Sequence, residues 1–438
     1  MRAPSLVTLL ITFLVSAAAS PLPPFSASSL SLSDPVARLS SYSPSSSITL
    51  PLARRFNGTG SANVLKFDQA RAKATRSRPR GDGGSSDMNA GTVASDGVFN
   101  AAAASEVVSY VVTVLLGEAR TPYNLLVDTG SSNTWVGAKE PFVPSSSTHY
   151  TGDLVSVHYG SGSFNGFEIT DTITLGNGLT LKNQSIGVAI HSSGFDGVDG
   201  ILGIGPQDLT RGSLFFESDK IIPTVTDNAW YAGLIDEYEV GISFHPDSPY
   251  NGQANGEVTF GGIDSSKFDG ALQYVPLTTT SPASAFVGIE QSVRYGEKNS
   301  ILEHTAGILD TGTTLILIAT DAFNRYQKYT GGVLDKDTGL LCITKEQYGN
   351  LKTLNFKIGH QEYALTPNAQ IWPRALNKDI GGTDDGIYLI VNDLQSETGK
   401  GLDFINGMTF LQRFYAVYDI GNSRVGLART PYTDDDSN

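Results

Sequence analysis

Cysteine is nearly absent from this chain of 438 residues. The one cysteine, Cys342, cannot form an intrachain disulfide, so buried apolar surface must hold the fold together. The length allows two or three domains of ordinary size, each with its own core. We expect Cys342 to be a small, buried or half-buried side chain, because no basic surroundings that would ionise its thiol can be recognised.

Histidine and long apolar runs are also scarce. The six histidines show no paired ligand spacing, so we expect no metal site and no cofactor. The apolar stretch 6–15 is too short to span a bilayer and is followed by small residues, which predicts a secretory signal peptide over residues 1–20. No later stretch is long enough to span, so we do not expect a membrane protein.

Basic residues are in the minority, and they are unevenly placed. The chain has 30 Lys and Arg against 44 Asp and Glu, which argues against nucleic-acid binding. Residues 21–90 hold nine basic and four acidic residues, whereas 91–438 hold 20 and 40. We therefore expect residues 21–95 to be a basic propeptide that docks on the acidic body at neutral pH and leaves when carboxylates protonate. A disordered, Ser/Pro-rich spacer is the alternative.

Within this basic segment, the residues 64–67 are expected to form a short strand and 69–75 a short helix. Residues 81–86 have the composition of a flexible linker, a suitable place for proteolytic release. The cut is expected between about Arg80 and Ala104.

One short sequence occurs twice. An apolar run leads into Asp-Thr-Gly followed by hydroxyl residues, first at Asp128 and again 182 positions later at Asp310. A lone Asp-Thr-Gly is usually a turn, because Asp and Gly are ordinary turn residues. Two copies with matching flanks indicate two halves of one site.

The surrounding pattern predicts an all-β protein, with short alternating strands and many glycine-containing turns. A strand, an Asp loop and a glycine-bounded apolar strand (200–203, then 403–407) occur in this order twice, which indicates an internal duplication. If the halves pair about a pseudo-twofold axis, Asp128 and Asp310 face each other. Two touching carboxylates share a proton, so one can act as base on a water while the other acts as acid on an amide.

Further motifs accompany the duplication. They are Trp135, Tyr159-Gly-Ser-Gly-Ser163, Gly200-Ile-Leu-Gly203, and the ending 410–419 with 425–428. Together with the two Asp loops they resemble the pepsin-type aspartic proteases over roughly 105–438, and the lack of disulfides is similar to a secreted fungal branch of that family. The resemblance implies a bilobal pepsin-like acid protease fold. Two pseudo-twofold-related β-barrel lobes, 96–275 with Asp128 and 276–438 with Asp310, would enclose a catalytic cleft.

The resemblance also implies roles for both Asp loops. Asp128 and Asp310 would be the catalytic dyad. The other loop residues would support it: threonine hydroxyls reaching the opposite loop, glycine N–H groups near the carboxylates, and hydroxyls on the outer carboxylate oxygens (Thr129, Gly130, Ser131, Thr311, Gly312 and Thr313).

By the same resemblance, Tyr159 would be the tyrosine of a substrate-covering flap, with Trp135 as its hydrogen-bond partner. Gly160 and Ser161 would bind substrate backbone. Some fungal relatives carry an Asp where this chain has Ser161, and that Asp favours Lys before the cut, so we expect a preference for large apolar residues here. Asn406 replaces the aliphatic residue usual at its position, for which a buried hydrogen bond is the expected reason.

The function implied is that of a secreted, monomeric aspartic endopeptidase, made as a zymogen and active at acid pH. It would bind proteins or peptides in extended form, and pepstatin-type inhibitors would block it. Its own propeptide would inhibit it, with Lys66 or a neighbouring basic residue reaching the dyad. Asn57 and Asn183 are candidate glycan acceptors. Secretion to the exterior is the expected destination, and delivery to a vacuole is the alternative.

Two other classes of function compete with this one. A non-catalytic binding protein of the same fold typically lacks an Asp of the dyad or an intact flap, and this chain has both. An adhesive cell-wall glycoprotein would fit the Ser/Thr-rich composition, but it leaves the duplicated Asp loops unexplained.

Overall fold

The computed structural model of the protein describes residues 47–56, 64–77, 108–176, 178–246 and 254–436, all within one compact unit, Ser45–Asn438. The predicted signal peptide, the expected cleavage region and the candidate glycan site Asn57 lie outside the described residues. No helix in the described part of the chain is long and apolar enough to cross a membrane.

Thirteen strands form the larger sheet, in the order β11-β23-β22-β9-β10-β1-β2-β3-β8-β4-β7-β6-β5. Their bounds are β1 Ile48–Phe56, β2 Val108–Leu116, β3 Thr121–Asp128, β4 Thr134–Val136, β5 His149–His158, β6 Ser163–Leu175, β7 Leu179–Ser193, β8 Gly200–Gly203, β9 Glu239–Phe244, β10 Ala254–Phe260, β11 Asp269–Pro276, β22 Phe414–Asp419 and β23 Arg424–Arg429. Because β2 also pairs with β6, the strands β2, β3, β8, β4, β7 and β6 close into a barrel.

A second sheet of seven strands has the order β18-β17-β12-β13-β21-β14-β20, and a small third sheet has the order β15-β16-β19. Their bounds are β12 Gly288–Tyr295, β13 Asn299–Leu309, β14 Ile316–Ile318, β15 Val333–Leu334, β16 Leu341–Cys342, β17 Leu354–Ile358, β18 Gln361–Leu365, β19 Tyr388–Leu389, β20 Val391–Asp393 and β21 Phe404–Asn406. The α-helices are α1 Val64–Ser77, α2 Val225–Tyr231, α3 Thr320–Thr330, α4 Lys345–Gly349 and α5 Met408–Leu411. Five short 3-10 helices complete the described elements: η1 Gln207–Thr210, η2 Ser265–Lys267, η3 Ala283–Ala285, η4 Asn368–Gln370 and η5 Arg374–Ile380.

The two halves repeat one pattern of strand pairing around their Asp loops. In the first half β3 pairs in parallel with β8, β8 pairs antiparallel with β4, and β4 pairs in parallel with β7. In the second half β13, β21, β14 and β20 pair in the same order and with the same directions. Each Asp loop lies between the first strand of its set and the short third strand. The predicted internal duplication is therefore present in the topology.

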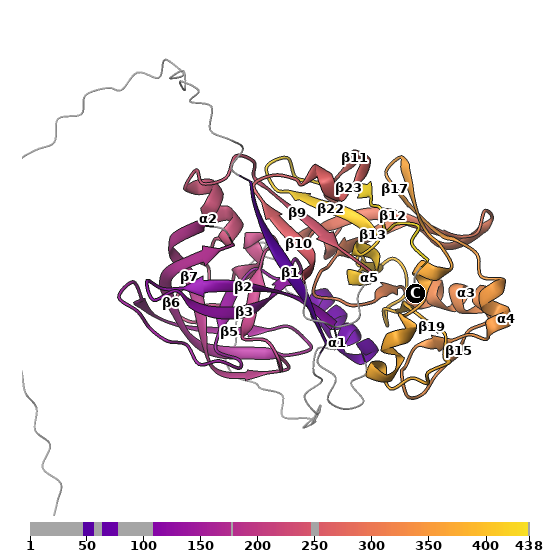
Figure 1. Ribbon diagram of the computed structural model, residues 1–438, viewed down its shortest axis with the longest axis horizontal. Helices are drawn as coiled ribbons and strands as arrows, with labels where there is room; N and C mark the ends of the chain where they lie inside the picture. The colour runs from indigo at the N-terminus through magenta and orange to yellow at the C-terminus, as the bar shows by residue number, and fades with distance from the viewer. Residues whose placement is uncertain (1–46, 57–63, 78–107, 177, 247–253, 437–438) are drawn as a thin grey trace, which may run out of the picture. The chain divides into compact units, whose positions relative to one another are not determined.

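Strand β1 comes from the basic N-terminal segment and was not expected from the sequence. It pairs with β10 from Ile48 to Ala53 and with β2 from Ala53 to Phe56, as the indigo strand in Figure 1 shows. Proline is normally excluded from the middle of a sheet because it lacks an N–H. Pro51 is tolerated because β2 begins to pair only at Ala53, so one side of β1 has no partner strand at Pro51.

The predicted strand 64–67 and helix 69–75 are one continuous helix, α1. Its buried residues are Val64, Leu65, Phe67, Asp68, Arg71, Ala72 and Thr75. They follow the i, i+3, i+4, i+7 spacing of one helical face. The strand prediction was wrong because Asp68 and Arg71 are polar members of the buried face, which interrupt the apolar period on which the prediction depended.

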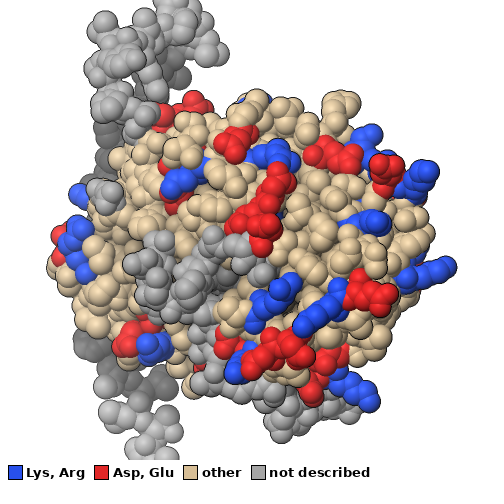
Figure 2. All heavy atoms as spheres, turned by 45° about the vertical axis from the view of Figure 1, so that its right-hand side comes forward, with Lys and Arg blue, Asp and Glu red and all other residues tan. Residues whose placement is uncertain are grey.

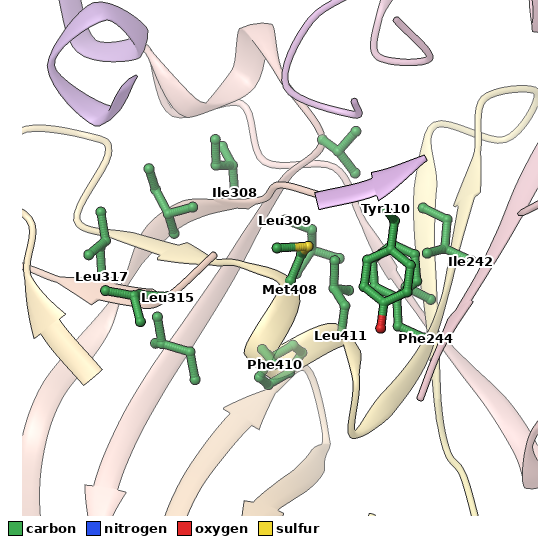
Figure 3. Packing of buried hydrophobic residues seen from close by; sticks show 14 of the residues in the cluster. Tyr110, Ile242, Phe244, Ile308, Leu309, Leu315, Leu317, Met408, Phe410 and Leu411 are labelled. Atoms are coloured by element: carbon green, nitrogen blue, oxygen red, sulfur yellow. The ribbon is translucent and has the colours of Figure 1, made fainter. Parts of the chain in front are cut away.

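One hydrophobic cluster contains residues of both halves, including Val127 and Leu309, the residues that precede the two Asp loops. Figure 3 shows Leu309 with Met408 of α5, and Tyr110 with Phe244. The last two rings stack with centroids 3.7 Å apart. The backbone that carries each Asp is thus anchored by buried side chains on the strand before it.

Charged side chains lie mainly at the surface, and acidic and basic ones are interspersed on the face drawn in Figure 2. Pairs such as Lys378–Asp384 at 3.1 Å and Arg294–Glu362 at 3.0 Å are exposed, so each contributes little stability. The ion pairs made by Arg71 of α1 differ because both partners are buried.

Candidate active site

The two Asp loops meet, and their threonines link them. The Thr129 N–H donates to Thr311 Oγ1 at 2.9 Å, and the Thr311 N–H donates to Thr129 Oγ1 at 3.0 Å. Each hydroxyl also donates onward, Thr129 to the carbonyl of Leu309 at 3.3 Å and Thr311 to that of Val127 at 2.8 Å. All four bonds are buried, so they hold the loops in one fixed arrangement.

Asp128 and Asp310 are both buried, and their loops bond them in matching ways. Gly130 N–H donates to Asp128 Oδ1 at 2.9 Å, and Gly312 N–H donates to Asp310 Oδ1 at 3.0 Å. The Ser131 hydroxyl donates to Asp128 Oδ2, and the Thr313 hydroxyl to Asp310 Oδ2 at 2.6 Å. Each Oδ2 thus accepts a hydroxyl and each Oδ1 a backbone N–H, and every one of these oxygens can still accept a further hydrogen bond.

The group between them is the guanidinium of Arg71, from helix α1. Its Nη2 donates to Asp128 Oδ1 at 2.5 Å and to Asp310 Oδ1 at 3.0 Å, while Nε donates to Asp310 Oδ2 at 2.7 Å. Arg71 is itself only 5% exposed. The planar fork of an arginine suits two carboxylates at once, which a lysine could not match.

Glycine is needed on both sides of this contact. A Cβ on Gly130 would lie 2.5 Å from Arg71 Nη2 and 2.6 Å from Asp310 Oδ1. A Cβ on Gly312 would lie 2.5 Å from Arg71 Nη2 and 2.7 Å from Asp128 Oδ1. A side chain at either glycine would therefore push apart the two carboxylates and the guanidinium that they bind.

Burial and the charge of Arg71 have opposite effects on the pKa of each carboxyl group. Burial raises the pKa of Asp128, and the charge of Arg71 only partly offsets this. Burial also acts to raise the pKa of Asp310, but Arg71, with the hydrogen bonds of Thr313 and Gly312, lowers the pKa below its usual value. While Arg71 is bound, the two carboxyl groups therefore differ in proton affinity.

Asp68 is a third buried carboxyl group, three residues before Arg71 on α1. It accepts the N–H groups of Thr314 at 3.1 Å and Leu315 at 2.8 Å, just after the second Asp loop. Burial raises its pKa to about 7, although those two N–H bonds act to lower it. Neither Asp68 nor Arg71 was expected from the sequence, for which Lys66 or a neighbouring basic residue was the predicted contact to the dyad. Lys66 is exposed, because it lies on the other face of the helix.

Further contacts fix α1 across the site. Gln69 Nε2 donates to the Asp393 carbonyl at 2.8 Å, and Arg76 Nη1 donates to the Leu394 carbonyl at 2.8 Å. On the other side the helix touches the tip of the β5–β6 hairpin. A Cβ on Gly160, whose φ is +80°, would lie 2.3 Å from the Ala70 carbonyl oxygen. The expected flap therefore rests directly on α1.

Tyr159, the predicted flap tyrosine, has no hydrogen bond to its predicted partner Trp135. Tyr159 follows β5, and its N–H donates to the Gly162 carbonyl at 2.8 Å; Ser161 lies half-buried at the tip. The Trp135 Nε1–H is buried and has no hydrogen-bond partner among the described residues. The expected Trp135–Tyr159 bond was therefore wrong for this structure. The rings of Trp135 and Tyr159 instead pack edge-on against Phe195, with ring centroids 5.0 Å and 5.3 Å from its own. Helix α1 lies against the tip of the hairpin at Gly160.

An open cavity of about 330 Å³ lies beside the dyad. Gly130, Ser131, Asn133, Tyr159, Leu209 and Arg211 are among the residues that line it. The last turn of α1 lines it too, through Thr75 and Ser77. Next to Arg71 there is thus room along the loops for an extended chain.

Asn406 forms a reciprocal amide pair. Its Nδ2 donates to Gln291 Oε1 at 2.8 Å, and Gln291 Nε2 donates back to Asn406 Oδ1 at 3.3 Å, with both residues fully buried. The Asn406 carbonyl also accepts the Asp310 N–H at 3.2 Å. The buried hydrogen bond expected for Asn406 is present, and it supports the second Asp loop.

The remaining candidate residues lie apart from the dyad. Cys342 is half-buried in β16. Asn183 is exposed, with φ at +56°, in an irregular part of β7. Within the described ranges no group of three or more His, Cys, Asp or Glu side chains could hold a metal ion.

Comparison with known proteins gives concordant results. A model of the family "Eukaryotic aspartyl protease" matches residues 109–430. Polyporopepsin of Irpex lacteus is 57% identical over 336 residues, which are 77% of this chain and 98% of that protein. Cathepsin E of Rattus norvegicus is 30% identical over 341 residues, 73% of this chain and 79% of that protein. The crystal structure of an aspartic proteinase from Irpex lacteus matches with a TM-score of 0.74 and 58% identity, covering 75% of this chain and 96% of that chain. The expected bilobal, mostly β fold is confirmed.

Proposed function

The chain belongs to the eukaryotic aspartyl protease family and is an aspartic endopeptidase, and from that premise we propose that it is made as a secreted zymogen. In this proposal Arg71 keeps the enzyme inactive at neutral pH. After acid releases helix α1, Asp128 and Asp310 hydrolyse peptide bonds in proteins. Proteolytic removal of residues 21–95 then makes the release permanent.

The observation that carries the proposal is the bridge from Arg71 to both carboxylates. Its Nη2 lies within 3.0 Å of both Oδ1 atoms, so no substrate carbonyl or attacking water can occupy that point while Arg71 is there. Three further contacts of α1, made by Asp68, Gln69 and Arg76, hold the helix in place. The described part of the basic segment thus fills the site that a substrate would need.

With Arg71 gone, a water in the place of Nη2 would lie within hydrogen-bond distance of both Oδ1 atoms. The ionised carboxylate would take one proton from this water as its oxygen attacks the carbon of the peptide carbonyl. The protonated partner would donate its proton to the carbonyl oxygen, which yields a neutral tetrahedral diol. Ser131 and Thr313 would keep the outer oxygens fixed throughout.

In the second half of the reaction the proton transfers reverse. A carboxyl group gives its proton to the amide nitrogen, the C–N bond breaks, and one diol hydroxyl returns its proton to the other carboxylate. The products are a carboxylic acid and an amine, and the dyad regains its single shared proton.

Expectations on specificity and destination complete the proposal. An extended protein segment would bind along the loops under the flap, with a preference for large apolar residues before the cut, and pepstatin-type inhibitors would compete for the same place. Secretion rests on the predicted signal peptide. A glycan at Asn183 is supported by the exposure of that side chain.

The experiment is to purify the precursor at neutral pH and acidify it to about pH 3–4, with and without pepstatin, beside the variant Asp128→Asn. We expect the wild-type precursor to be inactive at neutral pH and to digest protein after acidification, in a manner that pepstatin inhibits. The Asp128→Asn variant should be inactive at both pH values. Activity that survives Asp128→Asn would disprove the mechanism. A precursor that is fully active at neutral pH would disprove inhibition by α1.

A further inference from the structure

An exposed apolar surface lies near the flap and has no role in the chemistry described above. It consists of Leu154, Phe215 and Phe216, which are 47%, 73% and 67% exposed. The two phenylalanine rings touch edge to face with centroids 5.0 Å apart. We call these three residues the aromatic platform.

The platform is held firmly by its backbone. The segment that contains Phe215 runs antiparallel to β5, with a bridge between Leu214 and Val155, and the Phe215 N–H donates to the Leu154 carbonyl at 2.9 Å. The buried carboxylate of Asp153 accepts the N–H groups of Phe216 at 2.9 Å and Glu217 at 3.1 Å. Two exposed rings on a fixed backbone lose little conformational entropy on binding.

The position of the platform follows from the alternation of side chains in a strand. Leu214 and Val155 are bridge partners and both are buried, so their neighbours Phe215 and Leu154 point to the opposite, solvent side. The sequence and the backbone together therefore present these apolar side chains outward.

The platform continues the wall of the cavity beside the dyad. The same two segments line that cavity, through Ser156 and His158 of β5 and through the run 211–213. The Ser156 N–H donates to the Ser213 carbonyl at 2.9 Å. This hydrogen bond is the neighbour of the one between Phe215 and Leu154 along the same two segments. Ser156, the cavity-lining residue of β5 nearest to the platform, is two residues from Leu154, or about 7 Å at about 3.3 Å per residue.

We propose that the aromatic platform binds an apolar side chain of the substrate polypeptide, about two residues beyond the part that lies in the cavity. The inference rests on the proposed function, because the occupant is the flanking segment of the chain being cut. A substrate segment is favoured over a separate protein, because three side chains are far too few for a stable protein interface. Proteins would then be cleaved faster than short peptides of the same core sequence.

The test uses the acid-activated enzyme and a series of peptides. A core peptide that fills the cavity is extended by three residues at either end, with Phe or Ser at the second and third added positions. The variant is Phe215→Ser with Phe216→Ser. The matched control is Val333→Ser with Leu334→Ser, an adjacent pair of β15 that is 70% and 53% exposed and belongs to a different sheet.

For the wild type and the control we expect kcat/KM to rise about tenfold when a Phe-bearing extension is added at one end, with no rise for the Ser-bearing extension. The platform variant should cleave the core peptide like the wild type and lose the tenfold rise. Leu154→Ser alone should lose part of it, which keeps the test valid if the double variant folds poorly.

Three results would overturn the inference: a rise that persists in the platform variant, an equal loss on the core peptide, or a change confined to the rate of precursor activation. The last result would mean that the platform binds the precursor's own segment after Ser77 and not the substrate. Ser77 itself lines the same cavity. Failure of the wild type to cleave even the core peptide would count against the proposed function, a result distinct from normal cleavage without the extension effect.

Discussion

Arg71 faces three buried carboxyl groups, those of Asp68, Asp128 and Asp310, with a single positive charge. Such a group is costly to bury unless every member is hydrogen-bonded, which the N–H groups and hydroxyls of the loops provide. Removing the one cation should therefore be much more damaging to docking of α1 than removing an exposed charge.

Replacement of Arg71 tests this directly. We expect the Arg71→Gln precursor to show pepstatin-sensitive peptidase activity near pH 5–6 at least about 100-fold above the wild-type precursor, since an unpaired buried charge costs about 3–5 kcal/mol. Lys73→Gln, on the exposed side of the same helix, is the matched control and should stay silent. Equal activity in the two variants would contradict the role of Arg71.

Asp310 and Asp68 respond to pH in opposite ways. The pKa of Asp310 is lowered while Arg71 is bound, so its contribution to docking is present above its ordinary pKa and is lost as pH falls through the lowered value. The pKa of Asp68 is raised to about 7, so its contribution is complete below its ordinary pKa and is lost as pH rises through about 7. Of the three carboxyl groups around Arg71, Asp310 is therefore the one whose protonation favours release by acid, because the pKa of Asp128 is also raised.

Asp68→Asn should remove the pH dependence of docking that comes from Asp68 and leave that of Asp310 unchanged. In the wild-type precursor, protection of α1 against hydrogen exchange, corrected for intrinsic rates, should increase as pH falls from about 7 to about 5. In the variant we expect a smaller increase, because only the raised pKa of Asp128 still acts in that direction. A parallel increase in both proteins would show that another group is responsible.

The buried amide pair of Asn406 and Gln291 yields a prediction on stability. Asn406→Leu leaves the Gln291 amide buried without its partner, which should lower the free energy of unfolding by about 1–3 kcal/mol. Replacing both residues by Leu should restore most of the loss, because no buried amide is then left unpaired. Denaturant titration of the single and double variants measures this; additive losses would contradict it.

At the scale of elements, the basic N-terminal segment contributes both a strand and a helix to the fold. β1 pairs on one side with β10 and on the other with β2, and α1 lies between the Asp loops and the flap. The hairpin β5–β6 and the repeated strands around the loops could be predicted from alternation and glycine position. β1 could not, because a strand containing Pro51 becomes favourable only where its neighbours leave one side unpaired.

Replacement of Leu52 tests how much the burial of β1 contributes to the stability of the precursor. Its side chain is fully buried, so Leu52→Ala should lower the free energy of unfolding of the precursor by about 2–5 kcal/mol. Pro51→Ala, at an exposed neighbouring position of the same strand, is the control and should change it by less than about 1 kcal/mol. Comparable losses in the two variants would mean that burial of β1 is not what stabilises it.

At the scale of the whole molecule, the two halves repeat one pairing pattern, and each contributes half of the dyad. The halves differ in what they add beside the Asp loops: the first half contributes the β5–β6 hairpin, and the second contributes the backbone N–H groups that bind Asp68. The helix that blocks the dyad makes contacts with both halves, through the flap tip at Gly160 and the carbonyls of Asp393 and Leu394.

The sequence by itself determined the family and predicted that Asp128, Asp310 and their loop residues form one site, because the duplicated loop carries its chemistry within a few consecutive positions. Only the tertiary structure decided that Arg71, and not Lys66, reaches the carboxylates, which lie 57 and 239 positions away along the chain. It likewise decided that Trp135 lacks its expected partner. The physical reason is the same in both cases: which side chain meets a distant group depends on the phase and docking of a whole helix, which no local pattern records.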